Sequence, residues 1–258
     1  MSITQLSNKA NREVCNIDIV DFKTGAPYMH YEFANTTGLN VTSDMVYAMA
    51  HGTRKIGFQN PLEGEVTITA QVLPHKVFAL YSDGVIDTKG KYFVTKSLAA
   101  TEAGKLNITV TGGTVIAGSV FVYAEGQYGE TPIAGTFANG IFTATTASDI
   151  VANSTYEVGF MVSRTTGVQT VVLNNKRLPK DVAIYMDTFD KDTEGNLIPY
   201  RIAIKKAAIN RNLDLSFSSE GDPQEISLTF SVLEQDRDNF IDLMEITEEI
   251  TVTNAAGE

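Results

Sequence analysis

Hydrophobic and polar residues alternate strictly in three stretches of this 258-residue chain, at residues 65–72, 213–218 and 226–232. A period of two places every second side chain on the same face of a β-strand, so each stretch predicts a half-buried strand. Residues 219–225 are rich in turn formers and predict a hairpin between the second and third strands. The apolar positions, which we expect to be buried, are Val66, Ile68, Ala70, Val72, Leu213, Leu215, Phe217, Ile226, Leu228, Phe230 and Val232.

The polar positions of the same strands predict one broad, smooth and slightly acidic sheet face. None of them is basic. A face of this kind is also the ordinary solvent-exposed side of an antiparallel sheet, and the sequence is compatible with both interpretations. The residues are Glu65, Thr67, Thr69, Gln71, Asp214, Ser216, Ser218, Ser227, Thr229 and Ser231.

A short helix is expected directly after the first of these strands. Pro74 suits the first turn of a helix, where a backbone donor would have no partner, and Asp83-Gly84 is a typical helix end. The apolar side chains between these points recur at helical spacing. We expect them to pack on the core, and they are Val77, Phe78, Leu80 and Tyr81.

Weaker patterns predict further structure near the N-terminal end. Residues 14–22 alternate, and residues 28–33 follow a Gly- and Pro-containing turn, which predicts a hairpin. Residues 35–44 are rich in Thr, Asn and Gly and are interpreted as a loop. The apolar run at 45–52 has no clear period.

Residues 182–189 and 198–205 predict another antiparallel pair. The acidic joint between them, from Asp190 to Asn196, resembles the start of a calcium-binding loop. Arg201 stands where such a loop needs its bidentate acid, so we expect an ordinary hairpin turn and no metal site.

The composition changes between residues 97 and 173, which contain five acidic and two basic residues. Most of the other polar residues there are Ser, Thr and Asn. Strand candidates at 105–111, 119–123, 141–145, 156–163 and 168–173 predict a small immunoglobulin-like β-sandwich. We therefore expect a domain at 97–176, inserted into a host domain made of residues 1–96 and 177–258.

Charge and cysteine content exclude several classes of protein. The net charge of −11 and the pI near 4.8 oppose a protein that grips nucleic acid through phosphate contacts. The single cysteine, Cys15, rules out an internal disulfide framework and is expected to be a small buried residue of the first strand. The sequence has neither the pattern of a signal peptide nor an apolar run as long as a membrane helix, so we expect synthesis in a cytosol.

No pattern in the chain predicts catalysis. His30, His51 and His75 lack the spacing of a zinc site, and there is no nucleophile elbow, phosphate-binding loop or dinucleotide-binding glycine pattern. We expect a protein that is not an enzyme and that has no catalytic, cofactor-binding or metal-binding residues.

Two passages resemble the tail tube (major tail) proteins of tailed bacteriophages. The first is GEVTITAQVLPHKVFALYSDG, and the second is NLDLSFSSEGDPQEISLTFSVLEQDRDNFIDLMEITEE. The family's strand-to-helix pattern is matched by Glu63, Gly64, Thr67, Pro74, Ala79 and Leu80, and its closing segment by residues 236–246. The resemblance is diffuse and covers about 1–95 and 177–253, with 97–176 as an addition of a kind that the family tolerates.

The resemblance implies an all-β fold, an antiparallel β-sandwich or barrel with one short α-helix. It also implies a homo-hexameric ring that stacks into a tube, whose lumen conducts double-stranded DNA without binding it specifically. The polar positions above would face this lumen, where an acidic or neutral wall lets a polyanion slide. The implied partners are the tape measure protein in the lumen, the tail terminator and the distal tail protein, with a sheath if the tail is contractile.

The implied location is the virion tail, after synthesis in the bacterial host cytoplasm, with no membrane partner. An inserted domain that projects outward would crowd a sheath, which favours a non-contractile tail. A second function class stays open: a β-rich adhesin or capsid-decoration module that binds through 97–176. A related secretion-tube subunit is a close variant of the first class.

Overall fold

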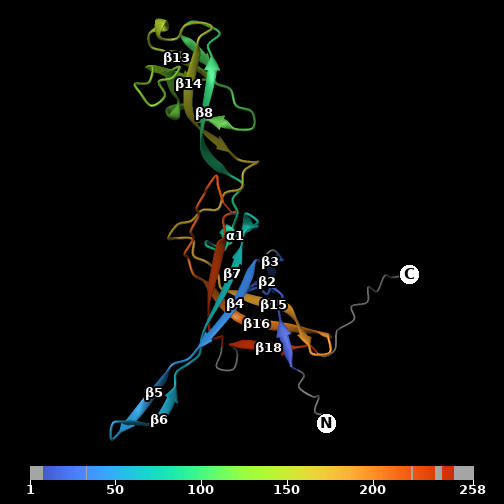
Figure 1. Cartoon of the computed structure of the whole chain (residues 1–258). Helices are drawn as coiled ribbons and strands as arrows, with labels where there is room; N and C mark the ends of the chain where they lie inside the picture. Colours follow the sequence, from blue (N-terminus) through green and yellow to red (C-terminus); the bar gives the residue numbers. More distant parts are fainter. Residues whose placement is uncertain (1–7, 33, 222, 236–239, 247–258) are drawn as a thin grey trace, which may run out of the picture. The chain divides into compact units, whose positions relative to one another are not determined.

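The computed structural model describes residues 8–32, 34–221, 223–235 and 240–246 (Figure 1). The chain divides into two compact units, which we describe separately. The first unit combines Met1–Gly84 with Leu173–Glu258, and the second is Val85–Val172. Strand β8 (Gly90–Ala99) belongs to the second unit, so the division lies ahead of residue 97.

The first unit is built on a nine-stranded antiparallel sheet (Figure 1). Two of the nine strands branch from its middle, because β1 (Lys9–Asn11) pairs with β15 and β18 (Ile241–Glu245) pairs with β16. The order of the main path is β3 (Pro27–Tyr31), β2 (Asn16–Asp21), β15 (Val182–Asp192), β16 (Leu197–Ile209), β17 (Ile226–Val232), β7 (Glu63–Ala70) and β4 (Thr36–Thr42).

The expected hairpins β2–β3 and β15–β16 are both confirmed. In the turn after β15, Asp192 Oδ1 accepts hydrogen bonds from the backbone N–H of Glu194 (2.9 Å) and Asn196 (2.8 Å). The Asn196 amide also donates to Asp192 Oδ2 at 2.9 Å. The carboxylate that suggested a calcium loop is thus occupied in fixing the turn.

The alternation of β7 and β17 places their apolar residues in one core. Val66, Ile68 and Ala70 are buried, as are the four predicted apolar positions of β17. All of these except Ile226 form one cluster with Ile17 and Ile19 from β2 and with residues of β15 and β16. The prediction for Val72 is wrong: β7 ends at Ala70, and the side chain is 61% exposed.

The helix α1 (Lys76–Ala79) is only four residues long. Val77, Leu80 and Tyr81 are buried in the core, as expected. Phe78 was expected there too but is only half-buried, with its ring against that of His75 at a centroid distance of 5.7 Å. In so short a helix the residue after Val77 points away from the core that Val77 enters.

The strand expected at 213–218 is absent, and with it the hairpin to β17. Pairing of β16 with β17 stops where the Asn210 N–H donates to the Thr229 carbonyl at 2.8 Å, and the chain then leaves the sheet. Leu213 still packs against the core, but Leu215 is 43% and Phe217 89% exposed. β17 pairs with β7 in place of this segment.

One strand and a hairpin begin in the region interpreted as a loop and an aperiodic run. Residues 36–42 form β4, which pairs with β7 along its whole length. Beyond it, β5 (Met45–Ala50) and β6 (Thr53–Gln59) form a separate two-stranded sheet. His51 and Gly52 at its tip have φ values of 53° and 76°, the conformation that a tight hairpin turn requires.

The second unit consists of two small sheets around their own core. β14 (Thr155–Arg164) pairs with β8 on one edge, and on the other with β10 (Thr114–Val115) and β11 (Phe121–Ala124). The other sheet has the order β12 (Gly135–Ala138), β13 (Ile141–Ala144), β9 (Lys105–Asn107). The short 3-10 turns are η1 (Ala117–Ser119) and η2 (Ala147–Asp149).

Four of the five strand candidates in this region correspond to strands. Residues 168–173 do not, since they form only an isolated bridge between Thr170 and Asp87. The core includes Leu106, Ile108, Val122, Val158 and Phe160, none of which contributes to the core of the first unit. The immunoglobulin-like topology stays a prediction. The all-β class with one short α-helix is confirmed for the part of the chain that the structure describes.

Candidate functional site

The polar residues of β7 and β17 share one face of the sheet. Their register places Thr69 opposite Ser227, Thr67 opposite Thr229, and Glu65 opposite Ser231. The apolar residues between them are buried, so this face is turned away from the core. The two strongest alternations of the sequence therefore combine into one surface.

β4 adds a third row that the sequence analysis missed. Thr36 lies opposite Thr69, Gly38 opposite Thr67, and Asn40 opposite Glu65. Leu39, one position out of phase, packs against the core. The signal was a weak alternation of Leu39 and Val41 with small polar residues, hidden by a Thr-, Asn- and Gly-rich composition that is typical of loops.

We define the polar face as the outward side chains of β4, β7 and β17. No lysine or arginine occurs in any of these three strands. Glu65 and Ser227 are exposed, while Thr67, Thr69 and Thr229 are partly exposed. The Ser231 hydroxyl donates to Asn210 Oδ1 at 3.0 Å, which holds one end of the face in place. The result is a surface of hydroxyls and carboxylates, with no cation within its strands.

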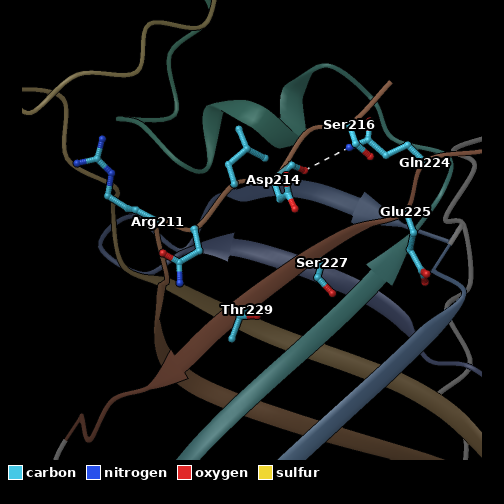
Figure 2. A pocket seen from close by; sticks show the side chains of 9 residues that line it. Arg211, Asp214, Ser216, Gln224, Glu225, Ser227 and Thr229 are labelled. Atoms are coloured by element: carbon cyan, nitrogen blue, oxygen red, sulfur yellow. Dashed lines mark hydrogen bonds between the residues drawn. The ribbon is translucent and has the colours of Figure 1, made fainter. Parts of the chain in front are cut away.

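A cavity of about 610 Å³ lies at the Ser227 end of the polar face (Figure 2). Asp214 and Ser216 line it together with Ser227 and Thr229, although they come from the irregular segment and not from a strand. The Gln224 amide donates to the Asp214 carbonyl at 3.3 Å and ties the two walls together. The structure thus brings these four predicted residues together.

Two other predicted residues do not join the polar face. Gln71 lies past the end of β7 and is exposed. The Ser218 hydroxyl is used in a local turn, where it donates to the Glu220 carbonyl at 2.8 Å. The polar alternation continues in sequence to both positions, but the strands that would carry it do not.

Arg211, which lies outside the alternating stretches of the sequence, lines the same cavity (Figure 2). Its Nη2 donates to the Asn174 carbonyl at 3.0 Å. The expectation of a surface without bases therefore holds for the three strands but not for the rim of this cavity.

The described residues contain little that could support chemistry. Among them, no group of three or more His, Cys, Asp or Glu side chains is arranged to hold a metal ion. His30 lies between two carboxylates, with Nδ1 2.6 Å from Asp18 Oδ1 and Nε2 3.0 Å from Glu32 Oε1. These contacts, that with Asp18 first, raise the pKa of His30. No helix in the described part of the chain is long and apolar enough to cross a membrane.

Comparison with known proteins gives one family. The model of the YomU/Tube protein family matches residues 12–246, a range that includes the polar face and the whole second unit. A search of curated proteins found no match. Because the family match covers most of the sequence, the chain belongs to the YomU/Tube protein family.

Proposed function

We propose that this protein is a structural subunit of a bacteriophage tail tube, with six copies in a ring and rings stacked into a tube. The family supports a tube-like phage component, and the hexamer and the tail role are our proposal. The observation that carries it is the polar face: three adjacent strands with hydroxyl and carboxylate side chains and no base. Such a wall suits a channel for DNA, because it offers no cation to the phosphates.

The two outer edges of the sheet also support assembly into a ring. Within the described residues, β3 pairs only with β2, and β4 only with β7. Strand edges without a neighbouring strand are a liability that closed rings remove. In this proposal neighbouring copies join edge to edge, and the polar faces together form the lumen.

The proposed partners follow from this role. Further copies of the chain form the ring and the stack. The other proposed partners are the tape measure protein in the lumen, the tail terminator and the distal tail protein, with a sheath if the tail is contractile. We propose the virion tail as the location, with no enzymatic activity.

A second candidate function, a binding module, is favoured by aromatic residues on the second unit. Phe93 and Phe121 are 52% and 47% exposed on the outer face of the β8–β14–β11 sheet. Tyr128 lies beside them, with its hydroxyl 3.2 Å from Thr95 Oγ1. A side chain at Gly159 would collide with both Phe93 and Tyr128, so these rings lie close over the strand.

Negative-stain electron microscopy of the purified chain at increasing concentration separates the two candidates. Rings or tubes with a central channel support the tube subunit. Compact monomers at every concentration contradict it and leave the binding module.

A further inference from the structure

Aromatic side chains gather around Gly159 on the outer face of the β8–β14–β11 sheet in the second unit. Phe121 lies directly opposite Gly159 in the register. The Phe93 ring and the Tyr128 hydroxyl lie close over Gly159, because an added Cβ there would be 2.6 Å from each. The Tyr123 and Tyr128 rings form a tilted pair 5.0 Å apart. Phe93, Phe121 and Tyr128 are about half exposed, so the rings are held by the sheet and still open to solvent.

Polar groups are set among these rings. Thr95 lies opposite Gly159 on the β8 side, and its Oγ1 is 3.2 Å from the Tyr128 hydroxyl. Glu157 lies opposite Tyr123, and its Oε2 accepts a hydrogen bond from the Tyr128 N–H at 3.2 Å. This bond fixes the segment that carries Tyr128, while a carboxylate has further lone pairs with which to accept. We define the aromatic face as Phe93, Thr95, Phe121, Tyr123, Tyr128 and Glu157.

This combination matches the surface chemistry of a neutral sugar ring. The face of an aromatic ring is electron-rich and attracts the polarised C–H groups that a pyranose exposes on one side. The hydroxyl groups at the edge of the sugar can donate to the Glu157 carboxylate and exchange hydrogen bonds with Thr95 and Tyr128. A wholly apolar partner would leave these polar groups unpaired on burial, which costs free energy.

Charge argues against the other class of ligand that stacks on aromatic rings. Single-stranded nucleic acids do so, but they also need a positively charged groove for their phosphates. The charged member of the aromatic face is an acid, Glu157. Lys91 shares this side of β8 but lies opposite Ser163, about 13 Å along β14 from Gly159. The aromatic face therefore favours an uncharged ligand.

We propose that the aromatic face binds a neutral oligosaccharide, with sugar rings stacked on Phe93 and Phe121. The Thr95 and Tyr128 hydroxyls and the Glu157 carboxylate bind the sugar hydroxyls. Contacts within the unit already hold the rings, so binding requires little further ordering of the chain. The inference adds a binding activity to the proposed tube function and does not rest on it, since every residue of the site belongs to the second unit.

Saturation-transfer difference NMR on the full chain tests the proposal. The probes are cellohexaose, maltohexaose, chitohexaose and mannohexaose, and at least one of them should bind through the C–H protons of its sugar rings. Phe121→Ala should weaken that binding by about two- to tenfold, because one aromatic contact is lost. Phe121→Trp should bind at least as tightly as the unaltered chain, since it offers a larger ring. This second variant separates loss of the ring from loss of the fold.

Tyr92→Ala is the matched control. Tyr92 is 41% exposed, and it lies on the opposite side of β8 because it is in phase with Val94, which packs on the core. The variant should bind as the unaltered chain does. Binding of none of these oligosaccharides, or an equal loss in Tyr92→Ala and Phe121→Ala, overturns the inference. Rings that bind no sugar leave the tube function standing, whereas sugar binding by a chain that stays monomeric supports the inference and contradicts the tube function.

Discussion

Thr67 and Thr229 lie directly opposite each other in β7 and β17, with both side chains on the polar face. Their strand neighbours Val66 and Phe230 are fully buried. A substitution at either position therefore changes the polar face without disturbing the core.

Thr229→Lys tests whether the polar face lines a DNA channel. The variant should fold and assemble, because the position is partly exposed on the outward side. Each substitution is repeated in every subunit, so the lumen wall should bind phosphates and hold duplex DNA. Retention of linear DNA by assembled tubes should rise, and it should fall again as salt screens the charges.

Thr229→Gln is the matched control, with a longer side chain and no charge. It should behave as the unaltered protein does. Thr229→Lys tubes that retain no more DNA than Thr229→Gln tubes would indicate that this face does not line the channel.

Leu80→Ala tests the placement of α1 under the sheet. Leu80 is 6% exposed and belongs to the core of the first unit. Its truncation should lower the free energy of unfolding by about 2–5 kcal/mol, measured by urea denaturation. Phe78→Ala, at a half-buried neighbour, should cost less. A loss below about 0.5 kcal/mol for Leu80→Ala is a surface-type effect and rules out this packing.

His30 should respond to pH through its contacts with Asp18 and Glu32. Its folded-state pKa lies above the ordinary 6.5 because the Asp18 and Glu32 carboxylates accept hydrogen bonds from the ring and favour the protonated form. The contact therefore stabilises the fold fully below about pH 6.5 and ceases to do so as the pH rises through the folded-state pKa. The side chain is 52% exposed, so solvent screening keeps the effect small.

An NMR titration of the His30 ring measures this directly. Asp18→Asn should lower the His30 pKa, and Glu32→Gln should lower it less, since the Glu32 contact is longer. A titration curve unchanged by Asp18→Asn is incompatible with the described contact.

Removal of the second unit tests the independence of the two cores. Asp87 and Thr170 exchange backbone hydrogen bonds of 2.9 and 2.8 Å, so the two connecting segments run side by side. A short Gly/Ser linker in place of residues 85–172 should therefore close the gap. Far-UV circular dichroism and a cooperative melt should show a folded β-protein, whereas an unfolded product would mean that the first unit depends on the second.

The sequence predicted those elements whose alternation coincides with a paired strand. β7 and β17 alternate and have partners on the sheet. The burial predicted for their apolar residues is therefore confirmed, in β7 as far as Ala70. Residues 213–218 alternate equally well, but no strand pairs with them, and Phe217 is exposed. A period of two indicates which face a strand would bury and says nothing about whether a partner edge is available.

The sequence did not predict β4, β5 and β6, for the opposite reason. β4 gains its order from pairing with β7, although its Thr-, Asn- and Gly-rich composition is typical of a loop. Neither face of the β5–β6 hairpin is buried in its own unit. Its two strands therefore lack the alternation of apolar and polar residues that marks a half-buried strand. The change in charge indicates a boundary near residue 97, whereas β8 pairs with β14 of the second unit from Gly90 onward.

The most direct test of the account is a cryo-electron microscopy reconstruction of assembled particles. We expect six copies per ring, with β4, β7 and β17 turned toward the axis and Thr67 and Thr229 on the channel wall. A ring in which another face lines the channel, or a solution that holds only monomers at the highest attainable concentration, would contradict it.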